Sequence, residues 1–271
     1  MFRFVDLLST AVTLISLIVN FLILLPQLYK WLTDKRHLRA ILGSKNHYFW
    51  ITQSLFGPGS LSTNFIDNYT LITKNSAISC QKVAKLLDDA EIKYNVINDP
   101  DVPQYDEIHI GGPISNQHTN AYFKEYFTNF YFFDKVEKQQ QHQKYYNIHR
   151  ELLKYSDDFN GFQIGNTKYP IDEETDYMVL VKLTSDDLGC EKTVHLLFGG
   201  GDVASLVAAD FFTKHYKILH SKAKRRHYFF VIPVHKTTQT PQISSMEDLT
   251  EQMFDFKDLE PIPEQSINAP Y

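Results

Sequence analysis

"YDEIHIGGPISNQHTNAYFKEYF" occupies residues 105–127 and is the stretch that decides the predicted fold. A short apolar strand, DEIHI, breaks at a Gly-Gly-Pro turn, and an aromatic helix begins after Ser115 and Asn116. Glycines let peptide N–H groups approach an anion, and a helix N-terminus favours negative charge. The stretch therefore predicts a strand–turn–helix unit of an α/β domain, which either holds a ligand or only makes a tight corner.

The same alternation of strand and helix extends along most of the chain. Apolar or β-branched runs predict strands at six further places: residues 47–54, 69–73, 93–98, 176–184, 192–198 and 226–235. Helical spacing follows Ser76, the expected cap of a helix that reaches residue 90, and a second apolar helix follows the GGGD turn at 199–202. The polar, Gln-rich segment 134–161 is expected to be an exposed helix or excursion. The pattern predicts a Rossmann-like three-layer α/β domain with a mainly parallel sheet.

The N-terminal segment departs from the composition of a soluble domain. Residues 7–29 carry no charge, and these 23 residues suffice for one bilayer crossing, which needs about 20. Tyr29 and Trp31 stand where an interfacial aromatic belt would lie. A cleaved signal peptide fits poorly because the apolar run is long and no A-x-A site follows it. The alternative to one transmembrane helix is a helix buried in a core.

The charges that flank this segment predict its orientation. One basic residue precedes the span and four follow it closely: Arg3, then Lys30, Lys35, Arg36 and Arg39. The positive-inside rule then places the rest of the chain in the cytoplasm. The chain has only two cysteines, which also suits a reducing compartment. We expect a single-pass protein of the cell inner membrane that contacts the lipid bilayer and forms homo-oligomers.

These observations divide the chain into three parts. Residues 1–40 are expected to form the transmembrane helix and a basic juxtamembrane segment, and 46–236 the cytosolic Rossmann-like domain. Residues 237–271 are rich in acids and contain prolines, which predicts an acidic C-terminal tail. A net charge of -5 argues against a nucleic-acid partner. The chain has no metal-ligand spacing, so neither a metal nor a cofactor other than a nucleotide ligand is expected.

Three glycine-containing loops follow predicted strands, at 53–60, 111–116 and 199–202. Loops at the carboxyl ends of parallel strands share one edge of a sheet, where α/β proteins bind ligands. None is a G-x-G-x-x-G or Walker A motif, which weakens the case for NAD or ATP. Each glycine can also simply serve a tight turn. The candidate ligand-binding residues are Gly111, Gly112, Ser115, Asn116, Gly199, Gly200, Gly201 and Asp202.

The motifs YDEIHIGGPISN, DYMVLVKL and VHLLFGGGDVASLVAADFF resemble those of prokaryotic Rossmann-like domains of the SLOG and nucleoside-deoxyribosyltransferase-like group. The resemblance spans about residues 46–235. It implies that the candidate residues at 111–116 and 199–202 face a nucleotide-derived ligand. Deoxyribosyltransferases also need a nucleophilic carboxylate, for which Glu125 is the candidate. A transmembrane helix on such a domain resembles membrane-disrupting antiphage effectors.

Three functions are therefore considered. The first is a membrane-anchored sensor or effector that binds a nucleotide-derived ligand and acts through membrane association or clustering in antiphage defence. The second is an enzyme, a membrane-tethered nucleosidase or NAD-glycohydrolase-like hydrolase. The third is a structural protein whose core makes only protein contacts. The missing catalytic set favours the first.

Overall fold

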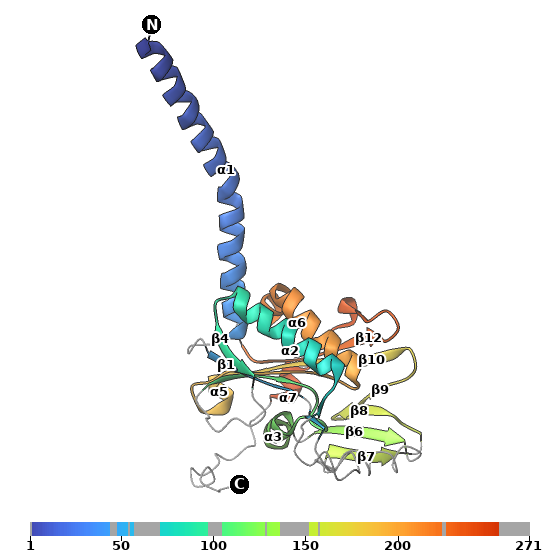
Figure 1. Cartoon of the computed structure of the whole chain (residues 1–271). Helices are drawn as coiled ribbons and strands as arrows, with labels where there is room; N and C mark the ends of the chain where they lie inside the picture. The colour runs from blue at the N-terminus through green and yellow to red at the C-terminus, as the bar shows by residue number, and fades with distance from the viewer. Residues whose placement is uncertain are drawn as a thin grey trace.

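A computed structural model describes residues 2–43, 48–53, 55–56, 71–96, 105–127, 129–135, 152–156, 158–223 and 226–254 of the chain. One long helix, α1 (Phe2–Leu42), rises from an α/β body (Figure 1). The body is built on an eight-stranded sheet in which seven strands have the order β13-β12-β10-β11-β5-β1-β4 and β14 pairs with β12. In that order the strands are β13 (Thr240–Pro241), β12 (Tyr228–His235), β10 (Thr175–Leu183), β11 (Val194–Gly199), β5 (Asp106–Ile110), β1 (Tyr48–Gln53) and β4 (Lys93–Val96), with β14 at Glu247–Asp248.

This sheet is mixed, which corrects the prediction of a mainly parallel sheet. Strands β4, β1, β5 and β11 are parallel to one another, whereas β10 is antiparallel to both β11 and β12. The connection from β10 to β11, residues 184–193, contains only the short helix α5 (Ser185–Leu188). A parallel crossover usually takes about a dozen residues or more, so this short connection suits a reversal of the chain between neighbouring strands. The prediction failed because β10 is buried on both faces, and its continuous apolar run imitates a parallel strand.

Each face of the sheet is covered by a different kind of layer (Figure 1). Helices α2 (Lys74–Asp89) and α6 (Asp202–Ala223) pack on one face together with the end of α1. The other face carries α3 (Gln117–Tyr126), α7 (Thr250–Met253) and a second, four-stranded sheet. The second sheet has the order β7 (Leu153–Ser156), β6 (Phe130–Lys135), β8 (Gly161–Ile164) and β9 (Thr167–Pro170). The remaining short elements are the hairpin of β2 (Leu55–Phe56) and β3 (Leu71–Ile72) and the 3-10 turn η4 (Ile243–Ser245).

The second sheet falls partly in the segment that was predicted to be an exposed excursion. Strand β6 begins before that segment and runs into it, and β7 pairs with it in parallel. Residues 136–151, which supplied the polar character behind the prediction, lie outside the described part of the chain. The rings of this layer pack against those of α3 and β11: Phe123 of α3 lies edge-on to Phe130 at 4.7 Å and to Phe198 of β11 at 5.4 Å. Burying such rings stabilises the layer by roughly 1.5–3 kcal/mol each.

Helix α1 has two environments along its length. Its residues from Thr13 onward form a stretch that is long and apolar enough to cross a membrane, and Leu24 in it is 57% exposed. At the other end, Leu38, Ile41 and Leu42 are at most 5% exposed and belong to the core beneath α6. The helix thus continues without a break past the predicted boundary at residue 40 and joins the body directly.

The segment that was expected to be an acidic tail is in part an element of the body. Strands β13 and β14 both pair with β12, and the peptide N–H of Leu249 donates to the carbonyl of Phe229 at 2.9 Å. Met253 and Phe254 are buried in the core on the α3 face. Residues 255–271 lie outside the described part of the chain.

Candidate functional site

The carboxyl ends of the parallel strands share one edge of the central sheet. Strand β1 has β4 on one side and β5 on the other, so the order of connection reverses between β1 and β5. Such a switch point is where open α/β sheets bind ligands. The turn after β5 and the turn after β11 lie together at this edge, because a Cβ atom on Gly112 would be 3.8 Å from the carbonyl oxygen of Gly199. Of the predicted third loop, residues 57–60 lie outside the described part of the chain.

The turn at 111–116 is held by its own side chains. Gly111 has φ of 104°, in the region that favours glycine. Asn116 caps α3: its Oδ1 accepts from the peptide N–H groups of His118 at 3.0 Å and Thr119 at 3.3 Å, and its Nδ2 donates to the Ile110 carbonyl at 3.1 Å. The half-buried Ser115 directs its hydroxyl towards the Gly112 carbonyl at 3.4 Å. Asn116, one of the predicted ligand-binding residues, therefore shapes the turn.

The glycines of the turn at 199–201 are close to other parts of the protein. A Cβ atom on Gly199 would lie 2.3 Å from the Cβ of Ala204, and one on Gly200 would lie 2.0 Å from Ile171 Cδ1. Packing alone therefore demands glycine at these two positions. At Gly201 a Cβ atom would lie 3.0 Å from Oδ2 of Asp176 and, in the part of the chain that the structure describes, would have no other non-neighbouring atom within 4 Å.

Asp202, the first residue of α6, joins two helix N-termini at this edge. Its Oδ1 accepts a hydrogen bond from the hydroxyl of Thr73 at 2.9 Å. Thr73 is the N-cap of α2, in place of the predicted Ser76, whose peptide N–H donates to the Thr73 hydroxyl at 3.0 Å. Lys74, the next residue, is exposed. The edge therefore brings the N-termini of α2 and α6 together, with one lysine beside them.

Asp176, on β10, is a buried carboxylate that the sequence analysis did not single out. It is 1% exposed, and its Oδ1 accepts from the peptide N–H of Tyr177 at 2.7 Å. Its Oδ2 has no hydrogen-bond partner in the part of the chain that the structure describes. Burial raises the pKa of this carboxyl, opposed by the Tyr177 peptide, by Lys236 and by the Gly200 and Gly201 peptides. The only signal in the sequence was an acid at the start of a strand that is otherwise apolar.

Glu125, the predicted catalytic candidate, lies away from the glycine turns. It is exposed in the last turn of α3, eight residues after the helix begins, and this corresponds to a rise of about 12 Å. Its charge helps to raise the pKa of the neighbouring Tyr126, after the larger effect of burial. The structure therefore separates Glu125 from the other predicted site residues.

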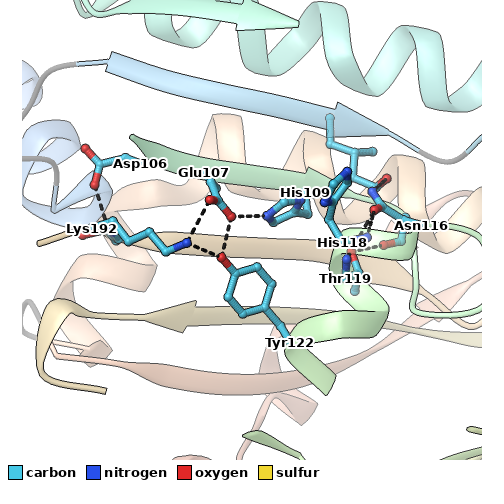
Figure 2. Close-up of polar contacts among 11 residues, drawn as sticks. Asp106, Glu107, His109, Asn116, His118, Thr119, Tyr122 and Lys192 are labelled. Carbon is cyan, nitrogen blue, oxygen red and sulfur yellow. Dashed lines mark hydrogen bonds and ion pairs between the residues drawn. The ribbon is translucent and has the colours of Figure 1, made fainter. Parts of the chain in front are cut away.

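A buried polar network lies beneath α3 (Figure 2). Glu107 and His109 project from the same side of β5, and Glu107 Oε2 is 2.8 Å from His109 Nε2. The hydroxyl of Tyr122 donates to Glu107 Oε2 at 2.5 Å, and Lys192 Nζ donates to Glu107 Oε1 at 3.0 Å and to the Tyr122 hydroxyl oxygen at 2.8 Å. His118 stacks on His109 with ring centroids 5.7 Å apart, so the network reaches the first turn of α3.

The electrostatics of this network suit a structural role better than proton transfer. Burial alone would raise the pKa of Glu107, but His109, Lys192 and Tyr122 outweigh it and hold the pKa at about 2. Burial lowers the pKa of His109, and burial with the Glu107 charge raises that of Tyr122. Proton transfer at neutral pH needs a group that titrates near 7, and these shifts move Glu107 and Tyr122 away from it. The network instead joins β5, α3 and Lys192, which lies two residues before β11. Sequence reasoning missed it because Glu107 and Lys192 are 85 positions apart.

A second buried polar group lies under the end of α1. His195 Nε2 is 3.2 Å from the Leu42 carbonyl oxygen, and His195 Nδ1 is 3.4 Å from the hydroxyl of Tyr228. Burial, with the charge of Lys182 as a smaller cause, lowers the pKa of His195 to about 3. The imidazole is therefore neutral where it holds the last turn of α1. His195 thus packs inside the strand layer.

Comparisons with protein-family models, with curated proteins and with solved structures found no match for the chain. Among the described residues, no group of three or more His, Cys, Asp or Glu side chains could hold a metal ion. The geometry thus defines a class of protein: a mixed α/β body with a switch-point edge, carried on a helix that is long and apolar enough to cross a membrane.

Proposed function

We propose that the protein is a membrane-anchored module that binds a nucleotide-derived ligand at the carboxyl edge of its central sheet. The observation that carries this proposal is the switch point between β1 and β5, beside which the Gly111–Asn116 turn and the N-termini of α2, α3 and α6 gather. Helix N-termini attract anions through their free N–H groups and their dipoles. The exposed Lys74 at the start of α2 adds a positive charge for a phosphate.

The same elements connect this edge with the membrane helix. Strand β11 carries His195 beneath the end of α1, and the strand ends at Gly199 in the glycine turn. Helix α6 begins at that turn, and its Lys217 pairs with Asp34 of α1. A ligand that shifts the turn thus acts on two elements that hold α1. This continuity supports a sensor or effector in which a bound ligand acts on α1. The cell inner membrane and the cytoplasmic body rest on the charges that flank the span, and clustering of the copies is part of the proposal.

Binding is preferred to hydrolysis because Glu125, the candidate nucleophile, does not lie at the edge, and because Asp176, the carboxylate that does, is buried with one oxygen bound by the Tyr177 peptide. Glu125 is exposed at the far end of α3. The role in antiphage defence rests on the resemblance to SLOG and nucleoside-deoxyribosyltransferase-like domains and on the membrane helix. No step in the binding proposal depends on that role.

The test uses the full chain in detergent micelles or nanodiscs. Mass spectrometry of co-purified small molecules identifies a resident nucleotide, and calorimetry measures binding of adenosine monophosphate, ADP-ribose and cyclic di-AMP. Lys74→Glu reverses the charge at the N-terminus of α2 and is expected to weaken binding about tenfold or more. Lys85→Glu is the matched control, because Lys85 is 74% exposed towards the other end of the same helix. Equal weakening by both variants, or no binding of any probe by the unaltered chain, would contradict the proposal.

A further inference from the structure

One buried acceptor at the glycine edge is left without a donor. Asp176 is 1% exposed, its Oδ1 is used by the Tyr177 peptide, and its Oδ2 has no partner among the described residues. The peptide N–H groups of Gly200 and Gly201 are hydrogen-bond donors near this carboxyl and lower its pKa, but neither meets hydrogen-bond geometry at Oδ2. Buried polar atoms are nearly always paired, and an unpaired one costs folding free energy. A hydrogen-bond donor on a ligand would explain why Oδ2 is buried without a partner among the described residues.

Among the described residues, Gly201 is the least crowded of the three glycines beside this oxygen. Side-chain atoms at Gly199 and Gly200 would collide with Ala204 and Ile171, respectively. At Gly201, by contrast, Asp176 Oδ2 is the one atom among the described residues, apart from those of its chain neighbours and its own helix, that a Cβ atom would have within 4 Å. Gly201 is half-buried whereas Oδ2 is buried, so a ligand hydroxyl reaches this oxygen from the edge of the sheet only by displacing the Gly201 peptide.

The charges around the oxygen select the chemistry of that group. The negative charge of the carboxylate repels a phosphate. The positive end of the dipole of α6, a helix of 22 residues that begins at Asp202, disfavours a cation. A neutral hydrogen-bond donor avoids both the repulsion by the carboxylate and the unfavourable interaction with the helix dipole. A hydroxyl is the smallest such group that a nucleotide offers.

We propose that the Gly199–Gly201 turn is a subsite for a neutral sugar hydroxyl, which displaces the Gly201 peptide and donates a hydrogen bond to Oδ2 of Asp176. This inference rests on the proposed function, because it assigns the sugar of the same ligand. Strand β10 is two strands from β5 in the sheet, a separation of roughly 10 Å that a nucleotide can bridge. The phosphate then lies at the turn after β5 and the sugar at the turn after β11.

Asp176→Asn is the decisive variant because it is isosteric. The Tyr177 peptide N–H needs an acceptor, so it retains the amide oxygen and leaves the amide NH2 group in the position of Oδ2. The acceptor of the subsite thus becomes a donor. Removing a buried, incompletely paired charge should leave the melting temperature of the chain unchanged or raise it.

The experiment measures binding of ribose 5-phosphate and of inorganic phosphate to the full chain in detergent micelles. The unaltered chain is expected to bind ribose 5-phosphate about tenfold more tightly than phosphate, and Asp176→Asn should abolish that preference while it still binds phosphate. Gly201→Ala, whose methyl group would lie 3.0 Å from Oδ2, should have the same effect.

Several outcomes overturn the inference, and they are distinguishable. If the unaltered chain binds both probes equally, or if Asp176→Asn keeps the preference, the subsite is refuted while the proposed function stands. If Asp202→Asn loses the preference for ribose 5-phosphate over phosphate and Asp176→Asn keeps it, the sugar binds the exposed carboxylate of Asp202. A sharp fall in the melting temperature of Asp176→Asn with an unchanged preference makes the carboxylate structural. Binding of neither probe by the unaltered chain refutes the subsite and counts against the proposed function as well.

Discussion

At the residue scale, Glu107 is a buried carboxylate that three neighbouring side chains hold in place. Its carboxylate is 5% exposed and has His109, Tyr122 and Lys192 as partners. Glu107→Gln removes the charge and leaves the Lys192 ammonium, itself only 13% exposed, without its carboxylate. Breaking a buried pair from one side costs about 3–5 kcal/mol. We expect a loss of about 3 kcal/mol in the free energy of unfolding, measured by chemical denaturation in detergent micelles and followed by circular dichroism.

Glu125→Gln provides the control for this change. Glu125 is exposed on α3, the helix that also carries Tyr122, so the same chemical change there should cost less than about 1 kcal/mol. If the two variants were destabilised equally, the network beneath α3 would not stabilise the fold.

The pKa of His195 leads to a pH-dependent stability. The folded value of about 3 lies below the unfolded value of about 6.5, so below pH 6.5 the unfolded chain binds a proton that the folded chain does not. The contribution of this group is therefore constant above pH 6.5 and is lost as the pH falls towards 3. Between pH 6.5 and 5 the loss amounts to about 2 kcal/mol.

His195→Gln removes this titration and keeps an N–H donor for the Leu42 carbonyl. The free energy of unfolding of the unaltered chain should therefore fall more steeply between pH 6.5 and 5 than that of the variant. Between pH 7 and 8 the two curves should run parallel. An identical slope in both proteins between pH 6.5 and 5 would show that His195 does not titrate in this way.

At the element scale, the start of α3 depends on one side chain. Asn116 Oδ1 accepts from two peptide N–H groups of the first turn, and the residue is 2% exposed. Asn116→Ala should lower the free energy of unfolding by about 1–2 kcal/mol, as the loss of an N-cap does. Ser115→Ala is the control, because the contact of the Ser115 hydroxyl is long, at 3.4 Å, and its loss should cost under about 0.5 kcal/mol. Thermal unfolding of the two variants checks this difference, which would vanish if Asn116 did not cap the helix.

The elements also show what sequence alone could predict. Strands β1, β4, β5, β10, β11 and β12 and helices α2, α3 and α6 follow local patterns of apolar spacing and were expected. The direction of β10 could not be inferred from its apolar run, although the short connection at 184–193 was a usable signal. The glycine turns were predictable because glycine marks turns directly. The Asp176 oxygen that has no partner among the described residues could not be predicted. Its burial and hydrogen bonding depend on contacts between β10 and α6, two elements that lie far apart in the sequence.

At the scale of the whole molecule, α1 is both a membrane-capable helix and part of the core. Lys35 pairs with Glu91 at 2.6 Å, and the ring of His37 lies edge-on to that of His220 at 5.0 Å. The last turn is then buried against α6 and His195. No described loop separates the exposed apolar stretch from the body, so a movement of either part is transmitted to the other along one helix (Figure 1).

Two leucines on this one helix test its double role. Leu42 is 0% exposed, so Leu42→Ala should leave a cavity and lower the free energy of unfolding of the body by about 2–5 kcal/mol. Leu24 is 57% exposed on the apolar stretch, so Leu24→Ala should leave the stability of the body nearly unchanged in detergent micelles. The measurement is chemical denaturation followed by circular dichroism, with carbonate extraction of membranes as the readout of anchoring in both variants. Both variants should remain in the membrane fraction, since either leaves most of the apolar stretch intact. If Leu42→Ala unfolded no more easily than Leu24→Ala, the end of α1 would not be part of the core, and the route proposed from the glycine edge to the bilayer would lose its physical basis.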